Sequence, residues 1–136
     1  MAAYVPRTGQ VIALQYLTNK VATPENLVYK LFCNNVTPAE TDTAATYTEA
    51  AGGGYSAITL TGASWTVTAA TPSAATYAQQ TWTFTGALTT NPTVYGYFVI
   101  RASSLDLVLA ETFTSFTPAA NGDNIKLTPQ ITATHT

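Results

Sequence analysis

The chain has 136 residues, and 9 % of them are charged, five as Lys or Arg and seven as Asp or Glu. An average soluble domain carries roughly 25 %. The formal net charge of −2 and the scattered cations exclude a nucleic-acid or anionic-membrane partner. Apolar residues make up 46 %, which excludes a disordered chain. At this length we expect one domain with a core of its own.

Residues 1–10 contain Pro6 and Gly9 and show no periodicity, so they predict a short N-terminal arm. The remainder, 11–136, is predicted to be the folded domain. Strong helix formers such as Glu, Lys and Met are scarce there, whereas Thr, Val, Tyr and Phe are abundant. We therefore expect strands and no long helix.

Apolar runs that alternate with period two and end in Gly, Pro, Asn or Ser predict about eight strands. They are Val11 to Leu17, Leu27 to Cys33, Tyr55 to Leu60, Trp65 to Ala70, Tyr77 to Thr85, Val94 to Arg101, Leu107 to Thr114 and Ile125 to Thr132. Residues 39–54 are predicted to form a long loop with one helical turn or short strand. Pro129 inside the last run favours an edge position or a bulge.

This number and spacing of strands predicts an all-β fold, a single-domain antiparallel β-sandwich or jelly-roll-like barrel. No apolar run is long enough to cross a membrane, and the N-terminus lacks the pattern of a secretory signal. Trp82 shares the more apolar face of its strand with Phe84, so we expect it in the core. Trp65 is left open between core and surface.

The residues needed for most catalysis are missing. The only histidine, His135, is penultimate, where an imidazole is rarely held for nucleophilic catalysis or metal binding. Cys33 is alone and lies on an apolar face, which indicates a small buried hydrophobe. The acidic residues of the long loop match no calcium-binding spacing. We expect no enzyme, no cofactor and no metal site.

Glu111 stands out because it shares a strand face with Leu109 and Phe113. If the hairpin places Arg101 opposite Leu107, then Tyr97 lies opposite Glu111. A carboxylate on such a face needs partners, which Tyr97, Arg101 or Lys30 would supply. We interpret Glu111 as a group that sets strand register or meets a neighbouring subunit, rather than as a catalytic acid. Glu111→Ala is then expected to reduce stability or assembly.

The charge deficit is concentrated in one region. No residue from Ala50 to Ile100 is charged. A surface with few charges is poorly protected against edge-to-edge association. The region is therefore expected to be covered by copies of the chain or by a larger assembly, with compositional drift as the plainer alternative.

Four segments together resemble a group of small proteins encoded by tailed bacteriophages, especially cyanobacterial and environmental phages. They are Leu31-Phe32 with Asn34-Asn35 and Thr37-Pro38, then Tyr47 to Glu49 before Gly54-Tyr55 and Ala57 to Leu60, then Val94 to Val99, then Leu109 to Glu111 with Phe113. The resemblance covers about 27–130 and is most specific around Tyr95-Gly96-Tyr97. It implies a β-rich virion component such as a head decoration (cement) protein, and it carries no catalytic residues.

From the resemblance and the composition we expect a trimer on the outer capsid surface of the virion, assembled in the host cytoplasm. Its partners would be the major capsid protein and copies of itself. The candidate interface residues are Tyr4, Arg7, Trp65, Tyr97, Arg101 and Glu111. The alternative is a tail, fibre or baseplate component that binds host-surface carbohydrate, which a groove with exposed Trp65 beside Tyr55 would support.

Overall fold

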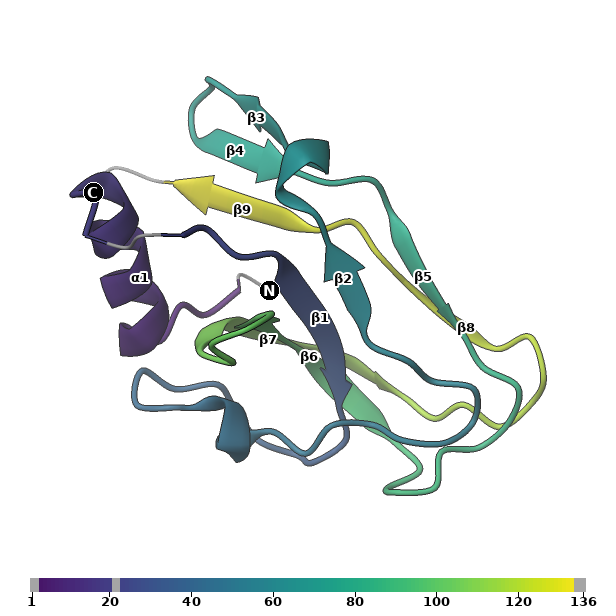
Figure 1. Cartoon of the computed structure of the whole chain (residues 1–136). Coiled ribbons are helices and arrows are strands. Elements are labelled where there is room, and N and C mark those ends of the chain that lie inside the picture. Colours follow the sequence, from purple (N-terminus) through teal and green to yellow (C-terminus); the bar gives the residue numbers. More distant parts are fainter. Residues whose placement is uncertain (1–2, 21–22, 134–136) are drawn as a thin grey trace.

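The computed structural model describes residues 3–20 and 23–133, and this part of the chain is an all-β sandwich with one α-helix (Figure 1). Within it the helical elements are α1 (Arg7–Leu17) and two 3-10 turns, η1 (Ala44–Thr46) and η2 (Gly62–Ser64). The described strands are β1 (Leu27–Phe32), β2 (Ile58–Leu60), β3 (Thr66–Thr68), β4 (Ser73–Thr76), β5 (Gln80–Thr83), β6 (Val94–Arg101), β7 (Leu107–Phe116), β8 (Asn124–Leu127) and β9 (Gln130–Ala133).

The first layer is a four-stranded antiparallel sheet in the order β2-β1-β6-β7. Strand β6 is buried on both faces, which explains its almost continuous apolar sequence. Tyr97 and Val99 point into one core cluster, whereas Phe98 and Ile100 point into the other. The predicted hairpin of β6 and β7 is confirmed.

The second layer consists of a three-stranded sheet, β3-β4-β9, and the pair β5-β8. The two ladders follow one another along the chain, because β4 leads to β5 and β8 leads to β9. Pro129 separates β8 from β9, and its carbonyl accepts a hydrogen bond of 3.0 Å from the Tyr77 amide. A proline cannot donate to a ladder, which explains the interruption. Among the described strands β8 and β9 each have one partner, so the edge position predicted from Pro129 is confirmed.

The main core fills the space between the layers. Side chains from β1 and β6, such as Tyr29 and Val99, pack there with Trp82 and Phe84 from the other layer. Trp82 is 4 % exposed, and its indole N–H donates to the Ser56 carbonyl at 3.1 Å. The core position predicted for Trp82 is confirmed.

The opposite face of the four-stranded sheet is covered by the long loop after β1. Tyr47 from this loop packs against Phe32 and Phe98, with ring centroids 5.0 and 5.2 Å apart. The long loop is confirmed, and its helical turn is η1. At Gly52 to Gly54 the backbone has positive φ values of 80°, 58° and 76°, which glycine adopts without strain.

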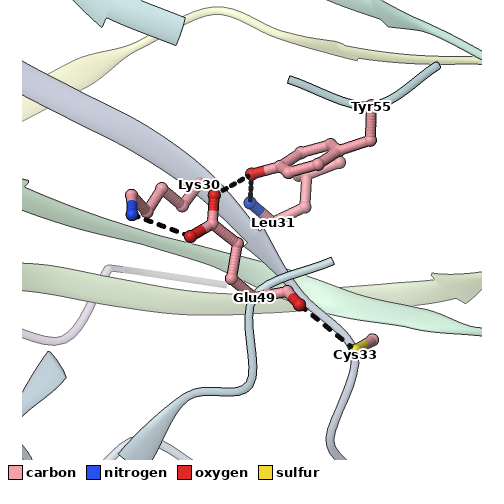
Figure 2. A network of polar contacts seen from close by, with 5 residues as sticks. All are labelled: Lys30, Leu31, Cys33, Glu49 and Tyr55. Carbon is pink, nitrogen blue, oxygen red and sulfur yellow. Dashed lines mark hydrogen bonds and ion pairs between the residues drawn. The ribbon is translucent and has the colours of Figure 1, made fainter. Parts of the chain in front are cut away.

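A polar network fastens the end of this loop to β1 (Figure 2). The Lys30 ammonium lies 2.7 Å from one Glu49 carboxylate oxygen, and the Tyr55 hydroxyl donates to the other at 3.1 Å. The same hydroxyl accepts from the Leu31 amide at 3.1 Å. Cys33 is buried beside this network, as predicted, and its thiol donates to the Thr48 carbonyl.

The strand predicted over Val11 to Leu17 is wrong, because these residues lie in α1. Pro6, with φ fixed for a helix start, directly precedes α1. At the other end Asn19 has φ 54°, and the Lys20 amide donates to the Gln15 carbonyl at 2.8 Å. That is the Schellman pattern which ends helices. The boundary expected between residues 10 and 11 therefore falls inside a helix.

The strand count is nine in the described residues, against about eight predicted. One predicted strand is a helix, β4 was not foreseen, and the run from Ile125 to Thr132 is divided into β8 and β9. Strand β4 has the sequence Ser-Ala-Ala-Thr, in which Thr76 is the one residue that favours strands. Its pairing with β3 and β9 places it in the sheet.

Candidate functional site

A cleft lies at the edge of the sandwich, where residues of β7 face residues of β8 and β9. It consists of two hollows of about 370 and 360 Å³ that share Tyr97, Glu111 and Leu127. The walls of the first hollow are mainly apolar, with Trp82, Phe113, Phe116 and Ile125. The second is lined by Ala3, Val5, Leu109 and Ile131 with uncharged polar residues of β9 and the turn before it. We call the two hollows together the β7–β8 cleft.

Tyr97 and Glu111 meet in the middle of this cleft. They lie opposite each other in the β6–β7 ladder, as predicted, and the Tyr97 hydroxyl donates to Glu111 Oε2 at 2.6 Å. The assumed pairing of Arg101 with Leu107 is wrong, because Ile100 lies opposite Leu107. A register shift between Val99 and Ile100 absorbs the difference.

Burial dominates the electrostatics of the two tyrosines beside Glu111. Tyr97 is 4 % exposed and Tyr29, which stacks on it with centroids 5.5 Å apart, is 1 % exposed. Burial raises the pKa of both phenols well above its ordinary value, and the negative charge of Glu111 raises it further. Both side chains are therefore protonated at neutral pH, so Tyr97 acts as a hydrogen-bond donor.

Arg101 lies away from the cleft, and its buried side chain joins three segments. Its guanidinium contacts the carboxylates of Glu25 at 2.6 Å and Asp106 at 3.4 Å, and it lies 5.7 Å from the centre of the Tyr16 ring. Lys30, the other predicted partner of Glu111, pairs with Glu49 instead. Of the three partners proposed for Glu111, Tyr97 is therefore the one that a described hydrogen bond joins to it.

The two arm candidates lie at the start of α1. Tyr4 is 42 % exposed and forms an antiparallel bridge with Ala110, through backbone hydrogen bonds of 2.7 and 2.9 Å. Arg7 is the first residue of α1, and its exposed side chain pairs with Glu40 at 3.2 Å. The described part of the arm is thus attached to β7 in the single chain.

Trp65 is half-buried and packs edge-on against Tyr77, with ring centroids 5.2 Å apart. The aromatic ring beside Trp65 is therefore that of Tyr77. The carbohydrate-binding alternative expected Tyr55 at this position. Trp65 lies inside the stretch 61–73, in which all the remaining residues are exposed. Val67, in the middle of β3, is 78 % exposed.

Sequence inspection missed an exposed apolar stripe on α1. Val11, Leu14 and Leu17 are 50, 61 and 84 % exposed, whereas Gly9 and Ile12 face the sheet. The spacing of three residues places the stripe along one side of the helix. That spacing was visible in the sequence, but it was interpreted as strand alternation.

Among the described residues, no group of three or more His, Cys, Asp or Glu side chains could hold a metal ion. His135 lies outside the described residues. No helix within the described part of the chain is long and apolar enough to cross a membrane. Comparison with protein-family models, with curated proteins and with solved structures finds no match.

Proposed function

We propose that the chain is a structural protein of a bacteriophage particle, a decoration protein that binds the outer capsid surface as a trimer and stabilises the head. Its partners would be the major capsid protein and its own copies. It acts by binding rather than by catalysis. The support is the sequence resemblance, the all-β fold and one surface of unusual composition.

The observation that carries the proposal is an exposed surface without charge at the edge of a sheet. Residues 61–73 are exposed apart from Trp65, and they consist of Thr, Ser, Ala and Gly with Val67 and Pro72, without a charged side chain. Strand β3 in this stretch is an edge strand, which among the described strands pairs with β4 alone. Natural edge strands are usually protected by charges, prolines or bulges. Such an edge is suited to lie against another subunit.

Uncharged contacts of this kind suit a protein present in many copies. Covering Thr and Ala side chains costs less desolvation than covering charges. Each contact is modest, but copies that bind one another and the capsid together gain effective concentration. Stabilisation of the shell is then mechanical, because each copy clamps neighbouring capsid subunits.

The test introduces one charge into this edge. Val67→Lys places an ammonium in the middle of β3, where the side chain is exposed. The melting temperature of the isolated variant is therefore expected to equal that of the wild type. Particles assembled with this variant are expected to lose it during purification. Asn35→Lys, at an exposed residue of the long loop, is the matched control and is expected to be retained.

Retention of Val67→Lys at the wild-type level would contradict the assignment of the β3 edge. Copy number in purified particles separates the two virion roles. A number comparable to that of the major capsid protein supports decoration, whereas a few copies per particle support a tail, fibre or baseplate component. A reconstruction of the particle would give the symmetry.

A further inference from the structure

We propose that the outer side of α1 is a contact between two copies of this chain, in which the two α1 helices pair antiparallel about a two-fold axis at Leu14. The contact surface is the row of Val11, Leu14 and Leu17, which we call the α1 stripe. The inference is independent of the proposed role in a virion, because the α1 stripe shares no residue with the β3 edge.

The α1 stripe lies on the side of the helix that faces away from the sandwich. Val11, Leu14 and Leu17 are 50, 61 and 84 % exposed, whereas Gly9 and Ile12 are buried. At 3.6 residues per turn, Leu14 lies about 160° around the helix from Ile12, so it is directed into solvent. The helix itself lies outside both layers of strands (Figure 1). Single exposed apolar residues are ordinary, but a contiguous row of them marks an interaction surface.

The spacing of the α1 stripe makes it complementary to itself. Val11 and Leu17 are each three residues from Leu14. When two such helices cross antiparallel at Leu14, the two Leu14 side chains meet, and Val11 of each copy meets Leu17 of the other. A two-fold interface requires a patch of this kind, which serves both partners equally. The stripe therefore fits a second copy of the chain.

The charges of α1 also favour a second copy. Arg7 is the one charged residue of the helix sequence, and it pairs with Glu40 at 3.2 Å. No like charges are therefore brought together when two stripes meet. The first turn contains no acid and the last turn no base, so no side-chain charge of the helix offsets its dipole. An antiparallel neighbour places the negative end of one dipole beside the positive end of the other.

A lipid surface fits the helix less well. Helices that lie on membranes carry Lys or Arg on their polar side. The polar residues of α1 after Arg7 are Thr8, Gln10 and Gln15, which are uncharged. The helix thus lacks the charges that would attract anionic headgroups.

The size of the α1 stripe predicts a weak and reversible contact. The exposed fractions of its three side chains correspond to about two whole aliphatic residues, on the order of 300 Å² per copy. Stable dimers bury roughly 800 Å² on each partner. We therefore expect the pair to form at high chain concentration and to dissociate on dilution.

The experiment is sedimentation equilibrium of the full chain at concentrations up to about 1 mM, where a weak dimer is populated. Leu14→Lys and Leu14→Glu each bring like charges together at the axis, and each is expected to weaken self-association at least about tenfold. An equimolar mixture of the two variants is expected to associate again, because opposite charges then meet. Leu105→Lys is the matched control, since Leu105 is 59 % exposed in the turn between β6 and β7, and it is expected to associate like the wild type.

A wild-type chain that remains monomeric at about 1 mM would overturn the proposal. Unchanged association of Leu14→Lys would also overturn it, and this variant is expected to fold normally because Leu14 is exposed. Failure of the mixture to associate would refute the pairing about Leu14. Binding of monomers to phosphatidylcholine vesicles, lost in Leu14→Lys, would assign the stripe to a lipid surface instead. Self-association through the β3 edge would not respond to charge at Leu14, so the two proposals fail separately.

Discussion

Four tyrosines make the stability of the protein dependent on alkaline pH. Tyr29, Tyr47 and Tyr97 are 1, 5 and 4 % exposed, and Tyr55 is half-buried. Burial raises the pKa of each phenol, and a neighbouring carboxylate adds to the effect. In the unfolded chain these phenols have a pKa of about 10. Folding therefore favours the protonated form of all four.

The sign and size of the effect follow from proton linkage. Because the folded pKa is raised, the stabilisation is fully present below pH 10 and is lost as the pH rises above it. Each phenol contributes about 1.4 kcal/mol per pH unit, so four remove about 5.5 kcal/mol per unit. A domain is typically stable by about 5–15 kcal/mol, so we expect cooperative alkaline unfolding within about one to three units above pH 10.

The assay is equilibrium urea unfolding at a series of pH values from 9 to 11.5, with tyrosinate absorbance recorded in parallel. The double variant Tyr29→Phe with Tyr97→Phe is expected to reduce the slope of the free energy of unfolding against pH by about half, because two of the four phenols are removed. Phe84→Leu, in the same core, lowers the free energy of unfolding without a titrating group and is expected to leave the slope unchanged. The reasoning would be refuted if the free energy of unfolding of the wild type did not fall with pH above 10, or if it fell as steeply in the double variant as in the wild type.

Three further substitutions test close contacts that the structure defines. Gly96→Ala places a Cβ 2.7 Å from the Phe32 ring and against a backbone carbonyl of β7, so it is expected to cost at least about 3 kcal/mol in urea unfolding. Gly9→Ala would favour an isolated helix, but its Cβ meets the β7 backbone and we expect a loss of about 1–3 kcal/mol. Arg101→Lys keeps the charge but loses the guanidinium that contacts Glu25 and Asp106 through two different nitrogens, and we expect a loss of about 1.5–3 kcal/mol by the same measurement.

Matched controls separate these contacts from general effects. A Cβ at Gly62 or Gly86 meets nothing within 4 Å, so alanine there is expected to change stability by less than about 0.5 kcal/mol. Arg7→Lys, in an exposed ion pair with Glu40, is expected to be equally silent. A more stable Gly9→Ala would show that α1 does not pack on β7 as described, and a neutral Gly96→Ala or Arg101→Lys would contradict the corresponding contact.

The β-rich core of the fold was predictable because its signals are local. Strand β6 has the bounds predicted for it, and β1 and β7 differ by no more than two residues at either end. Their sequences combine β-branched and aromatic residues, which favour a pleated, buried surface. The partner of Glu111 was predictable too, since strand register determines which residues lie opposite each other.

The helix α1 was not predicted because its sequence satisfies two periods at once. Val11 and Leu17 are consistent with alternation, but the same run has apolar residues three apart at Val11, Leu14 and Leu17. The end signals, Pro6 and Asn19, favour the helix. Tertiary packing also contributes, because Gly9 allows the helix to approach the backbone of β7.

The two tyrosine–carboxylate pairs show why the cleft could not be found from the sequence. Tyr97–Glu111 and Tyr55–Glu49 are similar in chemistry, and each carboxylate accepts a phenol hydrogen bond. They differ in what surrounds them, and that depends on how the layers meet. Glu49 is closed in by Lys30 and a loop, whereas Glu111 lies where the edge of one sheet stands open against β8 and β9. Local sequence patterns specify neither set of surroundings, so the position of Glu111 at the junction of the two hollows follows only from how the layers pack.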